Sequence, residues 1–212
     1  MMKMIGSSET NWQISNSHSF WDEIDSDDHL VQFYNNDEIL LDSLENFATT
    51  GFENDECVLV IATKAHLKSL KRRIVTHGYD IEKICLEGKF IPLDANDMLS
   101  KFMVTGWPDK ALFMNFVTKI ITKAHGTAGR KVRAFGEMVS ILWAQGYTGA
   151  TIQLQDLWNQ VRAIDSFCLF CAYPKSIFLD DTDDSIEHIC LAHNKIVAGD
   201  VQSKTEVVYK AA

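Results

Sequence analysis

The sequence predicts an α/β domain of three layers, in which helices flank both faces of a mainly parallel central sheet. Short apolar segments alternate with segments whose apolar residues recur at helical spacing, an order typical of βαβ units. Two of the short segments, 57–63 and 167–174, are apolar throughout, as expected of strands covered on both faces. The chain has 212 residues, enough for one such domain with a substantial core.

Strands are expected where short apolar runs are bounded by turn residues. These runs cover residues 29–34, 57–63, 89–94, 131–136 and 167–174, with a further edge strand at 204–209. The first helix is expected after Asn35 or Asn36, which can cap it, and should end at Gly51. Pro108 suits the first turn of a helix that runs to about His125. The other expected helices are 64–77, 97–103, 137–145, 149–164 and 183–194.

The chain is expected to divide into three parts. Residues 1–27 are polar, end within the acidic run DEIDSDD at 22–28, and are interpreted as a flexible acidic leader. Residues 28–200 form a single domain, since no repeat or low-complexity linker interrupts the alternation. Residues 201–212 are expected to form a C-terminal edge strand or tail.

Charge and composition exclude several classes of function. The formal net charge is −9 and the pI about 5.2, which argues against direct binding of nucleic acid or an anionic membrane. No apolar run approaches the roughly 20 residues that span a bilayer, and the start lacks the apolar core of a signal peptide. We therefore expect a cytoplasmic protein. Its five cysteines, odd in number and scattered, do not form a disulfide framework.

The segment VRAFGEMVSILWAQG, 132–146, raises the main question of function. It is expected to run from a buried strand into a helix, the kind of join at which α/β proteins bind ligands. If the strand extends to Glu137, then Arg133 and Glu137 share one of its faces. They form an ion pair, with each other or with neighbours, or they line a ligand pocket at the carboxyl end of the sheet. The two interpretations are compatible.

Other candidate ligand-binding residues lie near expected strand ends or on helices. Their alternative roles are structural: a hydrogen-bonded histidine, a helix cap for the aspartate, and core packing for the tryptophans. These candidates are His29, Tyr34, His66, Asp94, Trp143 and Trp158.

Two cysteine and histidine patterns are rejected as metal sites. His188 and His193 are five residues apart, so a helix does not place them and Cys190 on one face. Cys168 and Cys171 are three apart in an expected strand and point to opposite faces. We expect no metal and no other cofactor.

Six segments occur in a fixed order: HLVQFYNNDEILLDSLENFATTGF, VLVIATKAHLKSL, GKFIPLDANDMLSKFM, VRAFGEMVSILWAQG, LQDLWNQV and LFCAYP. Together they resemble the MEDS domain, the methanogen/methylotroph sensory domain of a dichloromethane-responsive repressor. The resemblance implies a RecA-like fold related to circadian-clock ATPases. It also implies sensing of small molecules such as hydrocarbon derivatives, in proteins that often carry DNA-binding or kinase domains. One departure is Leu154-Gln155, where the family usually has an acidic residue in place of the glutamine.

The resemblance also allows a test for ATPase chemistry. RecA-like ATPases carry G-x-x-x-x-G-K-[ST] after the first strand, where backbone N–H groups and the lysine hold phosphates. Here that join reads NNDE, without glycine or lysine, and Asp37 and Glu38 would repel phosphate. Glu137 matches the acidic residue that such ATPases carry at the end of a central strand. We expect a chain without a functional P-loop that is not an enzyme.

The expected function is a non-catalytic sensory module. It would bind a small molecule and regulate a partner, a kinase or a transcription regulator, directly or through homo-oligomer formation. The alternatives are a degenerate RecA-like nucleotide-binding protein or ATPase, and a docking module without a ligand. Fold alone does not choose among them.

Overall fold

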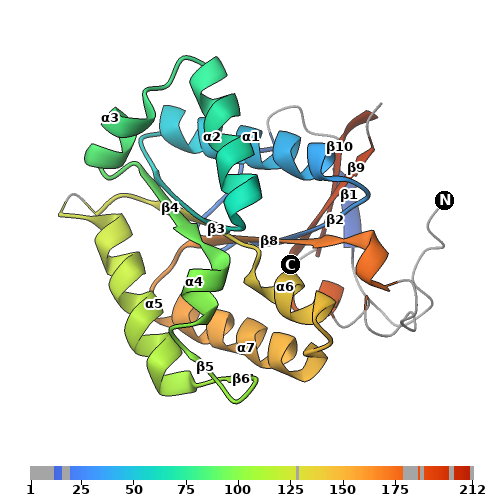
Figure 1. The fold of residues 1–212 in the computed structure, drawn as a ribbon. Coiled ribbons are helices and arrows are strands. Elements are labelled where there is room, and N and C mark those ends of the chain that lie inside the picture. Colours follow the sequence, from blue (N-terminus) through green and yellow to red (C-terminus); the bar gives the residue numbers. More distant parts are fainter. Residues whose placement is uncertain are drawn as a thin grey trace.

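The computed structural model describes residues 12–15, 20–127, 129–178, 186, 189–200 and 203–210. One large sheet lies in the middle with a layer of helices on each face (Figure 1). The predicted three-layer α/β fold is therefore confirmed. Among the described residues, no helix combines the length and apolar character needed to cross a membrane.

Six neighbouring strands of the sheet run parallel, and two more continue it antiparallel at one side. The parallel strands, in order across the sheet, are β9 (Lys195–Asp200), β2 (His29–Tyr34), β8 (Cys168–Pro174), β7 (Val132–Gly136), β3 (Cys57–Ala62) and β4 (Phe90–Asp94). Beyond β9 lie β10 (Ser203–Lys210) and then β1 (Trp12–Ser15). The carboxyl ends of the parallel strands therefore meet along one edge.

The helices divide between the two faces (Figure 1). One face carries α1 (Asp37–Glu53), α2 (Lys64–Thr76) and α3 (Ile81–Leu86). The other carries α4 (Ala95–Leu99), α5 (Lys110–His125), α6 (Met138–Ala144) and α7 (Thr148–Ile164). A 3-10 turn, η1 (Lys175–Phe178), follows β8. Each face has its own buried apolar cluster, as expected when helices cover a sheet on both sides.

Five helices begin at a capping side chain. Each cap accepts a hydrogen bond from the backbone N–H three residues later, which stabilises the helix by roughly 1 kcal/mol. The caps are Asn36, Thr63, Asp80, Asp94 and Asp109. Asn36 and Thr63 follow β2 and β3 closely, and Asp94 is the last residue of β4, so α1, α2 and α4 begin at the carboxyl edge of the sheet.

The expected flexible leader is part of the fold over its described residues. Phe20 and Ile24 are buried in the cluster under α1, because their apolar side chains cover the end of that core. Farther upstream, β1 pairs with β10. The strand expected at 204–209 is present as β10, but it lies between β9 and β1 and is not the sheet edge.

Several expected element boundaries were wrong. The helix expected at 97–103 ends at Leu99, and Met103 instead pairs with Pro108 in a hairpin of β5 (Met103–Val104) and β6 (Trp107–Pro108). α5 consequently begins after Asp109, which caps it. The elements α3, β1 and β9 were not predicted. Of the helix expected at 183–194, residues 186 and 189–191 are helical, and 183–185, 187 and 188 lie outside the described residues.

Gly51 does not end α1, which continues to Glu53. Instead it lies where the helix packs most closely on the sheet. A Cβ atom at Gly51 would lie 2.6 Å from Cγ2 of Val58 and 3.2 Å from Cδ of Arg133. These separations are shorter than van der Waals contact, so the glycine is required by packing between α1, β3 and β7.

We predict that Gly51→Ala lowers the free energy of unfolding by about 1–2 kcal/mol, because overpacking a buried contact costs about 1–3 kcal/mol. An open helical site would instead gain up to about 1 kcal/mol from the same change. Urea denaturation measures the difference. The control is Gly136→Ala, where the added Cβ would meet no atom within 4 Å. A Gly51→Ala protein more stable than wild type would contradict this account of the packing.

Candidate functional site

Glu137 lies at the centre of a hydrogen-bonded cluster at the carboxyl edge of the sheet. β7 ends at Gly136, and the backbone of Glu137 turns into the helical region with φ −93° and ψ −7°. Its N–H still donates to the carbonyl of Ile61 at 2.9 Å. Its carboxylate is buried and accepts the backbone N–H of Thr63 at 2.8 Å. The side chain of Glu137 therefore continues the pairing of β7 with β3 beyond the end of the strand.

His66 supplies the second contact to the Glu137 carboxylate. It lies in the first turn of α2, where Thr63 accepts its backbone N–H. Its Nδ1 is 2.8 Å from Oε1 of Glu137, and its Nε2 is 3.5 Å from Oδ2 of Asp37. Asp37, His66 and Glu137 thus join the ends of β2, β3 and β7.

The two carboxylates change the protonation of His66. The hydrogen bond that the imidazole donates to Glu137 raises the pKa of His66, and the negative charges of Glu137 and Asp37 add to this effect. Burial opposes the shift but does not cancel it. The cluster can therefore hold an imidazolium between a buried and an exposed carboxylate, and a ligand that replaced either partner would change its charge.

Tyr34 and Asp94 lie at the same edge. Tyr34 ends β2 and is buried, and burial together with the charges of Glu137 and Asp37 raises the pKa of its phenol. Asp94 ends β4 and pairs in register with Ala62 of β3. Its Oδ1 caps α4 at 2.8 Å from the N–H of Asp97, whereas its Oδ2 is buried without a hydrogen-bond partner.

Arg133 is not part of this site. It lies four residues before Glu137 in a strand that rises about 3.3 Å per residue, on the half of β7 nearer the amino edge. Its guanidinium pairs with the buried Glu56 and donates to the carbonyl of Trp21 at 2.8 Å. It also lies 5.7 Å from the ring centroid of Phe47. Of the two interpretations, pairing with a neighbour is correct for Arg133, and it does not line the carboxyl edge with Glu137.

Three other predicted site residues pack against other parts of the molecule. His29 begins β2 at the amino edge and contacts Cys171 and His193. Trp143 packs against Phe178. The ring of Trp158 is buried in contact with Phe113 and Phe167. The structure therefore brings together Glu137, His66 and Tyr34, places Asp94 at the same edge, and gives the other four candidates different partners.

Sequence reasoning missed two members of the cluster. Asp37 was considered only for its charge at the start of α1, and Thr63 only as the end of a strand. Both follow apolar strands directly, and that position is the signal that identifies them. At the start of α1, the Asn36 side chain accepts the N–H of Ile39 at 3.1 Å, and the Asp37 and Glu38 carboxylates lie in the first turn. This negative helix start opposes phosphate binding.

The buried Arg133–Glu56 pair generates a prediction for stability. Glu56→Gln should lower the free energy of unfolding by about 3 kcal/mol, because it leaves the Arg133 charge buried without its counter-ion. Replacing both residues, as Glu56→Leu with Arg133→Met, should recover much of that loss. Chemical denaturation of the three proteins measures both effects. A single substitution that costs less than about 1 kcal/mol would be typical of a solvent-screened pair and would contradict the burial.

The raised pKa of His66 predicts a pH dependence. A histidine whose pKa is higher in the folded state contributes stability below its unfolded pKa of about 6.5, and that contribution is lost as pH rises through the folded value. His66→Gln should therefore cost most near pH 6 and progressively less toward pH 9. Urea unfolding of wild type and variant across this range measures the difference. A cost that increased with pH would show that the pKa is lowered.

Comparison with known proteins agrees with this architecture. The family model of the methanogen/methylotroph, DcmR sensory domain, MEDS, matches residues 28–194. Among solved structures, a KaiC-like protein from the hyperthermophilic archaeon Pyrococcus horikoshii OT3 is similar, with a TM-score of 0.54 and 13% sequence identity. The similarity covers 85% of this chain and 76% of that one. It shows that the two proteins share a fold. No curated protein matches. Because the family model covers most of the sequence, this chain belongs to the MEDS family of sensory domains.

Proposed function

We propose that this protein is a non-catalytic sensory module whose small-molecule ligand binds at the carboxyl edge of the sheet, beside Glu137 and His66. The supporting observation is the buried Glu137 carboxylate, held by the Thr63 N–H and by His66 at 2.8 Å each. Membership of the MEDS family supports a sensory role. A hydrocarbon derivative that carries a polar group is the ligand class that we favour, and a cytoplasmic location is part of the proposal.

The cluster offers a route from ligand to signal. A polar ligand that competed for Glu137 or His66 would loosen the contact between α2 and the end of β7. α2 is tied to α1 by Arg73, which lies 2.5 Å from Asp42 and 2.8 Å from Glu45. The two helices would therefore shift together. Both expose a charged surface, which a kinase, a transcription regulator or a second copy of the chain could contact.

Nucleotide binding is the main alternative, because the fold is shared with a KaiC-like protein. The local chemistry opposes it: the join between β2 and α1 has no glycine or lysine, and Asp37 and Glu38 lie where phosphates would be held. A docking module without a ligand is the second alternative. Both are outcomes of the experiment below.

The first test is a melting-temperature screen with Mg-ATP, other nucleotides and small organic compounds, including halogenated hydrocarbons. A ligand at about a hundred times its Kd should stabilise the native state by roughly 2.7 kcal/mol. A shift with an organic compound and none with nucleotides is the expected result. A shift with ATP would overturn the assignment, and no shift with any compound would favour the docking module.

A compound found in that screen allows a test of the site itself. Glu137→Gln should weaken its binding at least tenfold while the protein stays folded, because the amide keeps the shape but loses the charge that holds His66. Titration calorimetry gives the Kd, and circular dichroism reports folding.

The matched control is Asp165→Asn, which changes another carboxylate paired with a histidine. Asp165 lies 3.0 Å from His125, between the end of α7 and the start of β8, and thus away from the carboxyl edge. It should leave the Kd unchanged. An unfolded Glu137→Gln protein would assign the Glu137–His66 pair to stability, and equal binding by both variants would place the ligand elsewhere.

A further inference from the structure

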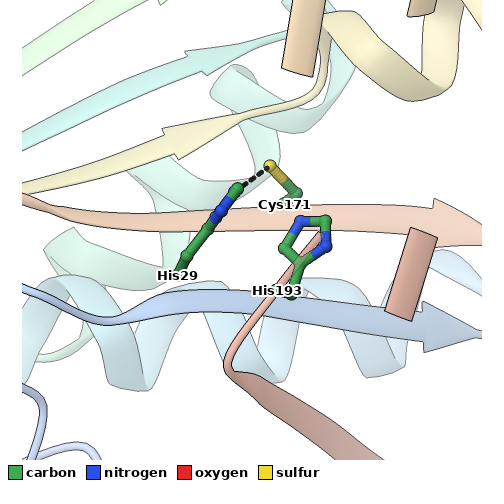
Figure 2. Close-up of side chains that lie close together, drawn as sticks. All are labelled: His29, Cys171 and His193. Carbon is green, nitrogen blue, oxygen red and sulfur yellow. Dashed lines mark hydrogen bonds between the residues drawn. The ribbon is translucent and has the colours of Figure 1, made fainter. Parts of the chain in front are cut away.

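His29, Cys171 and His193 form a buried cluster on the sheet face that α4–α7 cover, whereas the Glu137 carboxylate contacts α2 on the other face. One ligand atom from each residue lies within 4.8 Å of the other two, and all three side chains are at most 2% exposed. Figure 2 shows the two imidazole rings beside the cysteine sulfur. Nε2 of His29 is 3.7 Å from Sγ of Cys171, and the two ring centroids are 4.0 Å apart.

Three separate segments bring these residues together. His29 is the first residue of β2, and Cys171 pairs in register with Val31, two residues farther along, so both side chains point to the same face. Asn194 holds the third segment in place: its N–H donates to the His29 carbonyl at 3.0 Å, and its Oδ1 accepts the His29 N–H at 2.7 Å. His193, directly before Asn194, is thereby held beside β2.

The distances match those around a tetrahedral metal ion. Zinc bonds of about 2.3 Å to sulfur and 2.0–2.1 Å to nitrogen put neighbouring N and S ligands about 3.6 Å apart. The observed 3.7 Å between His29 and Cys171 meets this condition directly. The same bond lengths put two nitrogen ligands about 3.3 Å apart. The three ligand atoms lie within 4.8 Å of one another, so small rotations of the imidazole rings would bring them to the distances that zinc requires.

The surroundings prepare the histidines to act as ligands. Nδ1 of His193 lies 2.6 Å from the carbonyl of Ile189, and donation there directs the lone pair to Nε2, the usual arrangement for a metal-binding imidazole. Nδ1 of His29 is buried and makes no hydrogen bond of normal geometry.

We propose that His29, Cys171 and His193 bind a Zn²⁺ ion. Two imidazoles and one thiolate are ligands that Zn²⁺ prefers, and three protein ligands leave its fourth position open. Cys171 loses its thiol proton to solvent when the ion binds. The ion joins β2, β8 and the segment before β9, and so fastens the C-terminal strands to the parallel sheet.

This site differs from both patterns that the sequence rejected. The site takes only one residue from each rejected pattern: His193 from the first and Cys171 from the second. Its third residue, His29, lies more than 140 positions before Cys171 in the sequence. Because no two ligands are close in the sequence, no spacing motif exists to be recognised. Cys171 pairs in register with Gly136, the residue before Glu137, but the Glu137 carboxylate contacts His66 on the opposite face of the sheet.

The test is metal loading of the purified full-length chain. The protein is refolded in the presence of Zn²⁺, because a buried site exchanges slowly, and is then desalted and assayed for bound metal. Loading with Co²⁺ in place of Zn²⁺ adds a spectroscopic readout, since a thiolate ligand gives an intense sulfur-to-cobalt absorption band. We expect one ion per chain, a higher melting temperature and the thiolate band.

Matched cysteine variants assign the ion to the site. Cys171→Ala should abolish the band and weaken Zn²⁺ binding at least tenfold. Cys168→Ala removes an equally buried sulfur three residues away, in the apolar cluster on the other face, and should keep both. His193→Gln gives a second test should Cys171→Ala fail to fold, and it should weaken binding to a similar degree.

Two results would overturn the proposal. A folded wild-type protein that retains no Zn²⁺ and shows no thiolate band would show that the three residues only pack together. Equal metal binding by the Cys168→Ala and Cys171→Ala proteins would show an adventitious ion only.

Discussion

The parallel pairing of β3 with β7 is the constraint on which the candidate site depends. Backbone hydrogen bonds hold the two strands in register from Cys57 and Val132 to Ile61 and Gly136. Beyond the last strand pair, the Glu137 carboxylate takes the N–H of Thr63 that no strand partner satisfies. A buried N–H without a partner costs free energy comparable to a lost hydrogen bond. The same hydrogen bond therefore extends the pairing of β3 with β7 and holds the Glu137 carboxylate in the candidate site.

Polar groups collect at the two edges of this sheet, while its middle is apolar. At the carboxyl edge, helices begin directly after strands, so Asp37, His66 and Glu137 come into contact although they belong to three separate βα units. Toward the amino edge, Arg133 is neutralised by Glu56, and His29 begins β2 and lies close to Cys171, in the middle of β8, and to His193. Parallel strands produce this division because the middle of each strand crosses a core covered on both faces, whereas loops and helix starts supply polar partners at its ends.

Sequence patterns predicted much of the fold because they report local properties. The apolar runs at 57–63 and 167–174 are the central strands β3 and β8, and the helical spacing at 149–164 is α7 within one residue. Patterns failed where a distant contact decided the outcome. Gly51 looks like a helix end, but it is buried within α1 because Val58 and Arg133 approach it. Met103 continues an apolar helical pattern, but it pairs with Pro108 instead.

The sequence by itself determined the fold class, the family, and the position of Glu137 at the join of a strand and a helix, because these follow from periodicity, the order of segments and the residue at a strand end. It also determined that the start of α1 lacks the glycines and lysine of a phosphate loop. Only the tertiary structure decided which charges meet. In the folded chain Arg133 pairs with Glu56, His66 pairs with Glu137, and His29, Cys171 and His193 lie close together. Such partners are set by the order and register of strands, which bring together residues far apart in the chain and therefore leave no local signal in the sequence.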